Sequence, residues 1–259
     1  MHRIILFLLW GSIMFSCQQS SNSETVDFEE NLPLPGFDIE GSDPTAIMIA
    51  DKVMNSMGGR NAWDDTRIIC WTFFGKRRLI WDKHNGDVRI DFLNSDEKII
   101  VNIHTIEGKV FKNGQEMSHP DTLARYLKKG KSLWINDSYW LTMPYKMKDT
   151  GVTLHYIGED TIAGGEQMQF LHMTFKNVGD TPDNMYGIWI DYEENLVRQW
   201  AFYRSHEDPH PSFVNPWREY QKYGEILLSG DRGKSKLTDI KVLEEVPNSV
   251  FNTFEETNI

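Results

Sequence analysis

The sequence is poor in cysteine, since its 259 residues include only Cys17 and Cys70. Cys17 follows an apolar N-terminal segment, whereas Cys70 lies between Ile69 and Trp71 in a run typical of a strand. A single small thiol in such a run is usually buried. We therefore expect no structural disulfide, although the compartment inferred below is one in which disulfides can form.

Positive charge is also scarce. The chain carries 27 Lys and Arg residues against 38 Asp and Glu residues, which gives a formal net charge of -11. The longest basic run is Lys76-Arg77-Arg78. Because a nucleic-acid partner requires a basic surface that neutralises phosphates, we expect no nucleic-acid partner for this protein.

Familiar catalytic motifs are missing from the sequence. It contains no nucleophile elbow, no phosphate-binding glycine loop and no HExxH motif. Glu159 and Asp160 are neighbours in an expected strand, so their side chains point to opposite faces and cannot act as an acid–base pair. We expect that the protein is not an enzyme and that it needs no cofactor.

One segment is a candidate for metal binding. The run from His206 to His210 offers two imidazoles and two carboxylates within five residues, and both groups are ligands of zinc and related metals. The spacing matches no common zinc motif, and Pro209 and Pro211 stiffen the segment. We interpret it as a polar surface loop, with metal binding as the alternative, and we assign no residue to a metal site.

Long hydrophobic runs are missing as well, with one short exception at the N-terminus. Ile4 to Phe15 is apolar, His2 and Arg3 precede it, and Ser16-Cys17 follows it. Because a bilayer span needs about 20 apolar residues, this pattern indicates a signal peptide over residues 1–16. The sequence MFSC resembles the lipobox of bacterial lipoproteins, which implies acylation of Cys17, for example with palmitate. A secretory signal with an incidental cysteine is the alternative.

The residues that follow the signal are acidic and polar. Residues 18–43 contain seven acidic side chains, Pro33 and Pro35, and no lysine or arginine. A stretch of this composition buries too little apolar surface to become ordered. We expect residues 17–43 to comprise the lipidated cysteine and a disordered tether, and residues 44–259 to form a single domain. The tether would hold that domain at the membrane of the cell envelope.

The domain begins with a helix and continues as strands. Asp43 followed by Pro44 is a typical helix start, and Gly58-Gly59 is a typical helix end. From residue 66 to residue 117 the chain has strand character. Asn85-Gly86 and Asn113-Gly114 predict tight hairpin turns in that stretch, because type I′ turns need positive φ at both central residues.

In the second half of the domain, helical segments again precede strands. Leu123, Tyr126 and Leu127 predict a short helix that Gly130 ends, and residues 133–141 predict a second helical piece. Pro144 stops the helix because it has no amide donor. After it, Val152, Leu154 and Tyr156 alternate with polar residues, which indicates a half-buried strand and the start of a second antiparallel meander.

This order of elements, with YWLTMPYKMK at residues 139–148 and YGIWIDYEENLVRQWAF at residues 186–202, resembles the LolA and LolB carriers and similar outer-membrane lipoprotein-sorting proteins. The resemblance implies an α+β fold that is mainly antiparallel β: a strongly bent, incompletely closed barrel. Two or three helices would form a lid on its concave side. In these relatives the cavity accepts acyl chains or other apolar ligands. The resemblance also implies an outer-membrane lipoprotein on the periplasmic side or the cell surface.

Aromatic residues are abundant, at 12% of the chain, and many lie in the expected strands. A bent sheet would bring them together, and apolar pockets are often lined by such rings. The residues that we expect to bind a ligand are Trp71, Phe73, Phe170, Trp189, Trp200 and Phe202. A filled core is the alternative. Two functions follow: a membrane-anchored protein that binds an acyl chain or a lipidated partner, or a structural subunit of an envelope assembly.

Overall fold

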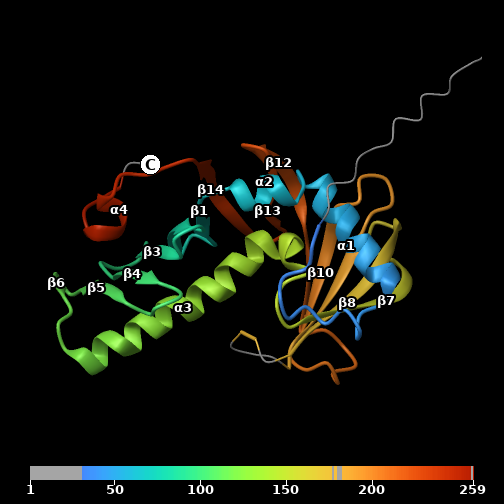
Figure 1. The fold of residues 1–259 in the computed structure, drawn as a ribbon, viewed down its shortest axis with the longest axis horizontal. Helices are drawn as coiled ribbons and strands as arrows, with labels where there is room; N and C mark the ends of the chain where they lie inside the picture. Colours follow the sequence, from blue (N-terminus) through green and yellow to red (C-terminus); the bar gives the residue numbers. More distant parts are fainter. Residues whose placement is uncertain (1–30, 177, 180–182, 258) are drawn as a thin grey trace, which may run out of the picture.

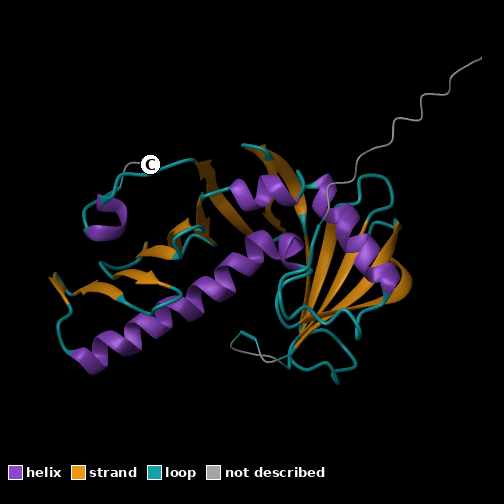
Figure 2. Ribbon diagram, viewed as in Figure 1, coloured by secondary structure: helices purple, strands orange, loops and turns teal. Residues whose placement is uncertain are grey.

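The computed structural model describes residues 31–176, 178–179, 183–257 and 259. In these residues every pair of neighbouring strands is antiparallel, and the strands form one nine-stranded sheet and one five-stranded sheet (Figures 1 and 2). The expected fold class, mainly antiparallel β with a few helices, is confirmed. The expected signal peptide (residues 1–16) and Cys17 lie outside the described residues.

The nine-stranded sheet has the order β12-β13-β14-β1-β2-β3-β4-β5-β6. Its strands are β1 (Ile68–Phe73), β2 (Arg77–Asp82), β3 (Asp87–Phe92), β4 (Lys98–Asn102), β5 (Gly108–Lys112), β6 (Gln115–Glu116), β12 (Arg218–Tyr223), β13 (Ile226–Arg232) and β14 (Ser235–Leu243). The predicted turn at Asn113-Gly114 joins β5 to β6, and both residues have positive φ, 54° and 76°.

The five-stranded sheet has the order β11-β10-β9-β8-β7. Its strands are β7 (Val152–Thr161), β8 (Gln167–Phe175), β9 (Met185–Ile190), β10 (Val197–Tyr203) and β11 (Phe213–Pro216). The helical elements are α1 (Pro44–Ser56), α2 (Arg60–Asp65), α3 (Pro120–Thr142), the 3₁₀ turn η1 (Met143–Lys146) and α4 (Ser249–Asn252).

A single extended segment joins the two sheets. β11 pairs with β10, whereas β12 pairs with β13, and Trp217 is the residue between them. Its amide donates to the carbonyl of Arg198 at 2.7 Å, and its side chain is fully buried. No strand pairing in the described residues joins the free edges β6 and β7. The expected barrel is therefore not formed, because the two sheets do not close on each other in the described residues.

The two expected helical pieces of the central region form one helix. α3 continues through Gly130, contrary to our prediction that this glycine ends a helix. A Cβ on Gly130 would lie 2.7 Å from Cγ2 of Ile99 and 3.2 Å from Cγ1 of Val101. The glycine therefore allows α3 to approach β4 closely, and it does not end the helix.

Pro144 ends α3, and a buried arginine supplies the hydrogen-bond donors that the proline lacks. The carbonyl of Trp140 would normally accept from the amide of residue 144, which proline lacks. Arg232 on β13 replaces the missing donor: its Nε and Nη2 donate to the Trp140 oxygen at 3.2 and 2.7 Å. The end of α3 is thereby fixed to the junction of the two sheets.

Part of the expected tether belongs to the fold. Phe37 is buried in the core, the amide of Leu34 donates to the carbonyl of Lys148, and the amide of Asp38 donates to that of Val152. Leu34, Phe37 and Asp38, which we had placed in the tether, are therefore in contact with the domain. The rest of the expected tether lies outside the described residues.

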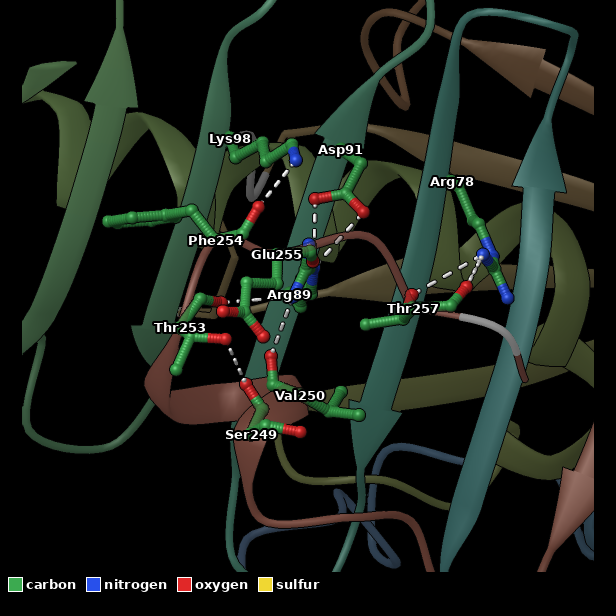
Figure 3. Close-up of polar contacts among 10 residues, drawn as sticks. All are labelled: Arg78, Arg89, Asp91, Lys98, Ser249, Val250, Thr253, Phe254, Glu255 and Thr257. Atoms are coloured by element: carbon green, nitrogen blue, oxygen red, sulfur yellow. Dashed lines mark hydrogen bonds and ion pairs between the residues drawn. The ribbon is translucent and has the colours of Figure 1, made fainter. Parts of the chain in front are cut away.

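The C-terminal segment, residues 249–257, covers the face of the nine-stranded sheet opposite α3 (Figures 1 and 3). Val250 packs with Ile68, Cys70 and Ile80 in a small apolar cluster. Basic side chains from four strands donate to backbone carbonyls of this segment, and one of them is Lys109 on β5, which donates to Asn252. Arg78 donates to Thr257, Arg89 donates to Val250, Thr253 and Glu255, and Lys98 donates to Phe254. These contacts hold the segment against the sheet.

Candidate ligand cavity

Strand alternation gives the five-stranded sheet one face toward the helices and one face away from them. Leu171 and Met173 on β8 and Trp200 on β10 contribute to the main core that α1 and α3 cover. Met168 on β8 and Ala201 on β10 belong to a separate cluster on the other face. The two faces of the sheet therefore pack in different clusters.

A cavity of about 530 Å³ lies between the C-terminal half of α3 and the helix-covered face of the five-stranded sheet. This volume is within the range of sites that bind small molecules, about 300–1,000 Å³. Eight of its nineteen lining residues are aromatic: Trp134, Tyr139, Trp140, Phe175, Tyr186, Trp200, Phe202 and Phe213. Aromatic rings are therefore the largest single class of side chain among the described lining residues.

The sheet wall is a row of aromatic residues across three strands. Tyr186 is directly opposite Phe202, and Phe202 is directly opposite Phe213. The ring centroids are 6.0 Å and 5.2 Å apart. Directly opposite residues share a face, so the register of β9, β10 and β11 places all three rings on the cavity side.

A buried ion pair holds α3, which forms the helical wall of the cavity, against β2. Arg77 on β2 donates to both carboxylate oxygens of Asp137 at 2.8 Å, and the Asp137 side chain is fully buried. Burial raises the pKa of Asp137, against the opposite effect of the Arg77 hydrogen bonds. The pair fixes the rotation of α3, and Tyr139 and Trp140 follow Asp137 on the turn that faces the cavity.

Two tyrosines supply hydroxyl groups to the lining. Burial raises the pKa of Tyr186 to about 12, and burial together with Asp149 and Tyr186 raises the pKa of Tyr139. Both hydroxyls are therefore protonated at neutral pH.

The lining also contains donors and charges of other kinds. The indole Nε1 atoms of Trp134 and Trp200 have no hydrogen-bond partner in the part of the chain that the structure describes, but both atoms are fully buried and do not open onto the cavity. Lys146 and Asp149 form an ion pair at 3.1 Å. Lys146 also lies 5.5 Å from the centroid of the Tyr139 ring. The cavity is thus apolar, with a few polar groups that can orient a ligand.

The structure divides the six expected ligand residues among three places. Trp200 and Phe202 line the cavity. Trp71 and Phe73 are buried in the main core, where the Phe73 ring lies 6.3 Å from Trp140, outside the lining. Phe170 and Trp189 stack on each other at 4.3 Å in the cluster on the opposite face of the sheet.

The sequence reasoning missed most of the cavity wall. Tyr186 and Phe213 could have been found from the parity of Trp200 and Phe202, since paired strands place opposite residues on one face. Tyr139 and Trp140 lie in the YWLTMPYKMK segment that carried the family resemblance. Their orientation depends on α3 being one continuous helix, whereas we had predicted that a helix ends at Gly130.

The remaining candidate features give no further site in the described residues. Within them, no group of three or more His, Cys, Asp or Glu side chains is placed to hold a metal ion. In the His206–His210 loop, Asp208 instead accepts from the amide of Ser205 at 3.2 Å. Among the described helices, none combines the length and apolar character needed to cross a bilayer.

Comparison with known proteins gives similarity of structure only. No protein-family model matches the sequence, and no curated protein matches it. A solved DUF1329 family protein from Desulfovibrio piger is similar at 14% identity and a TM-score of 0.45, over 81% of this chain and 98% of that chain.

Two other solved structures belong to the group that the sequence resembles. A domain from Vibrio parahaemolyticus, described as an outer membrane lipoprotein-sorting protein, has 9% identity and a TM-score of 0.42 over 80% of this chain and 96% of that one. A LolA superfamily protein from Nitrosomonas europaea has 11% identity and a TM-score of 0.38 over the same shares, 80% and 96%. The expected resemblance is confirmed, but at these values the ligand must be argued from the cavity itself.

Proposed function

We propose that this protein binds an apolar ligand, an acyl chain or the lipid of a lipidated partner, in the cavity between α3 and the five-stranded sheet. The observation that carries the proposal is the cavity itself. Large rings such as Trp71 and Trp217 are fully buried elsewhere in the core, yet about 530 Å³ beside Trp200 and Tyr186 is unfilled.

The energetics of such a site are mainly those of apolar burial. Each Å² of apolar surface removed from water contributes about 25 cal/mol before the cost of association is subtracted. Lys146 and Asp149 are paired with each other, so salt should have little effect on the affinity. The proposal assigns binding, and no catalytic step, to the cavity.

The proposal includes a place for the protein in the cell. We propose that residues 1–16 are a signal peptide, that Cys17 is lipidated and that the anchor holds the domain at the outer membrane. The charged start, the short apolar run and Ser16-Cys17 support this. A protein held at a membrane surface lies next to a supply of apolar ligands.

A neutral fluorescent probe, N-phenyl-1-naphthylamine, tests the binding proposal in the purified chain. We expect saturable fluorescence enhancement. Phe202→Asp should lower the affinity at least tenfold, because it places an unpaired charge in an apolar cavity. Phe170→Asp is the matched control, since it makes the same change on the opposite face of the sheet and should leave binding intact.

Melting temperatures separate loss of binding from loss of folding. Phe202→Asp must still melt cooperatively for its binding result to count, and Phe202→Asn supplies an uncharged polar variant if it does not. If the unaltered chain takes up neither this probe nor methyl palmitate, the binding proposal is wrong. A structural subunit of an envelope assembly is then the function to test.

A further inference from the structure

We infer that the cavity encloses one acyl chain at a time, of up to about twenty carbons, so that a ligand with several chains enters it by only one of them. This inference rests on the proposed function and specifies the ligand of the same site. It follows from the volume of the cavity, from the contacts that fix its walls and from the pairing of its polar groups.

The volume of the cavity limits the number of ligand carbons. A dry apolar cavity of about 150 Å³ holds one benzene molecule, which corresponds to about 25 Å³ for each carbon. At this density the cavity beside α3, of about 530 Å³, holds about twenty carbons. One palmitoyl chain is within that limit, whereas two such chains together exceed it. A second chain therefore stays outside the cavity.

The sheet wall is elongated, because its row of rings crosses four strands. The ring of Phe175 on β8 lies 5.1 Å from that of Tyr186 on β9. The row continues from Tyr186 to Phe202 at 6.0 Å and from Phe202 to Phe213 at 5.2 Å. All four rings line the cavity. An elongated apolar wall of this kind matches the shape of one extended chain.

Buried contacts prevent the walls from moving apart to admit a second chain. Trp140 on α3 meets Trp200 on the sheet wall edge-on, with ring centroids 4.7 Å apart, and Trp200 in turn lies 5.9 Å from Trp217. Arg232 contacts the Trp217 ring and donates to the Trp140 carbonyl at 2.7 Å. Separating α3 from the sheet would break this closed set of contacts and leave a buried guanidinium without acceptors, which is costly. The volume is therefore fixed by the fold.

The polar groups of the lining are already paired within the protein. Ser138 and Thr150 donate to backbone carbonyls at 3.3 and 2.8 Å, and Lys146 pairs with Asp149 at 3.1 Å. Because a buried donor without a partner is costly, this pairing lets a hydrocarbon enter without leaving these groups unsatisfied. The length of the chain, and not its head group, should therefore decide which ligands are retained.

Native mass spectrometry of the purified chain tests the inference. Methyl palmitate, methyl arachidate and methyl lignocerate, with acyl chains of sixteen, twenty and twenty-four carbons, are offered together from a methyl-β-cyclodextrin reservoir. We expect one ester for each protein chain. Methyl lignocerate should be retained about tenfold less than methyl palmitate, because the methylenes beyond the limit leave the reservoir without being buried in the cavity.

Two changes in the lining should move the limit in opposite directions. Phe213→Ala removes one ring, which frees the space of about six ligand carbons, and should bring methyl lignocerate within about threefold of methyl palmitate. Ile135→Trp adds a ring on the α3 side and should lower methyl arachidate relative to methyl palmitate about threefold. Each change tests the limit by itself, provided that the variant still melts cooperatively.

Phe170→Ala is the matched control. It removes a ring from the opposite face of the same sheet and should leave the distribution of bound esters unchanged. Two esters bound to one protein chain, undiminished retention of methyl lignocerate, or a distribution that neither lining change shifts would overturn the inference and leave the proposed function standing. Failure of every ester to bind would overturn both.

Discussion

At the scale of single residues, Arg232 is the side chain on which the end of α3 depends. It is 1% exposed, and its guanidinium lies 3.4 Å from the centroid of the Trp217 ring. Burial lowers its pKa to about 9, so it remains charged at neutral pH. Besides the Trp140 carbonyl, it donates to the carbonyls of Ser229 and Asp231. One cation thus satisfies acceptors from the helix and from β13.

Arg232→Met should lower the free energy of unfolding by about 3 kcal/mol, because it leaves the Trp140 carbonyl and its neighbours without donors in a buried site. Urea denaturation monitored by tryptophan fluorescence measures this change. The control is Lys222→Met on the adjacent strand β12, where the side chain is 62% exposed and the expected loss is below about 0.5 kcal/mol. Equal effects of the two changes would contradict this role of Arg232.

At the scale of elements, α3 connects the two sheets. Its N-terminal half packs on β4 and β5, and its C-terminal half forms a wall of the cavity (Figure 1). Gly130 sets the distance between α3 and β4. Glycine costs about 1 kcal/mol in a helix interior relative to alanine, so its presence in the middle of this helix is explained by packing rather than by propensity.

Gly130→Ala should therefore destabilise the protein by about 1–2 kcal/mol despite the better helix propensity of alanine, because the new methyl group overlaps Ile99. The measurement is the urea midpoint in a double-mutant cycle with Ile99→Ala, which removes the overlapping atoms. In the Ile99→Ala background the same change should be neutral or stabilising. Lys128→Ala, at an exposed position of α3, controls for the propensity gain alone. Stabilisation by Gly130→Ala in the unaltered background would contradict the packing argument.

At the scale of the whole molecule, strand alternation and turn motifs predicted the fold class, whereas the cavity depended on contacts between distant segments. Asn113-Gly114 is a local signal, and its turn is present. Residues 31–43 were assigned to a disordered tether from composition alone, and composition does not reveal that Phe37 would be buried.

Phe37 becomes part of the core only through its contact with the folded domain, and that contact joins parts of the chain far apart in sequence. The same reason explains the division of the expected ligand residues. Alternation along β10 correctly groups Trp200 with Phe202, but it cannot show that Phe170 and Trp189 face away from α3. That distinction depends on which face of the sheet the helices cover.

The anchoring proposal also belongs to the whole molecule. Cys17→Ala should move the protein from the membrane fraction to the aqueous fraction of its host, because the acyl chains contribute about 0.8 kcal/mol for each buried methylene and the variant lacks them. Fractionation followed by immunoblotting measures the shift. Cys70→Ala, at the buried cysteine, is the control and should stay in the membrane fraction. A Cys17→Ala variant that remains as membrane-bound as the parent would rule out lipidation as the anchor.

The C-terminal segment sets an order of events during synthesis. Arg89 and its acceptors Val250 and Glu255 are 161 and 166 residues apart in sequence. At roughly 5–20 residues per second, a ribosome needs on the order of ten seconds to translate that distance. During this interval β3 is already available, but the arginine that becomes fully buried there still faces water. The outer face of the nine-stranded sheet can therefore be completed only after residues 250–255 have been translated, and nascent chains that stop before them expose it.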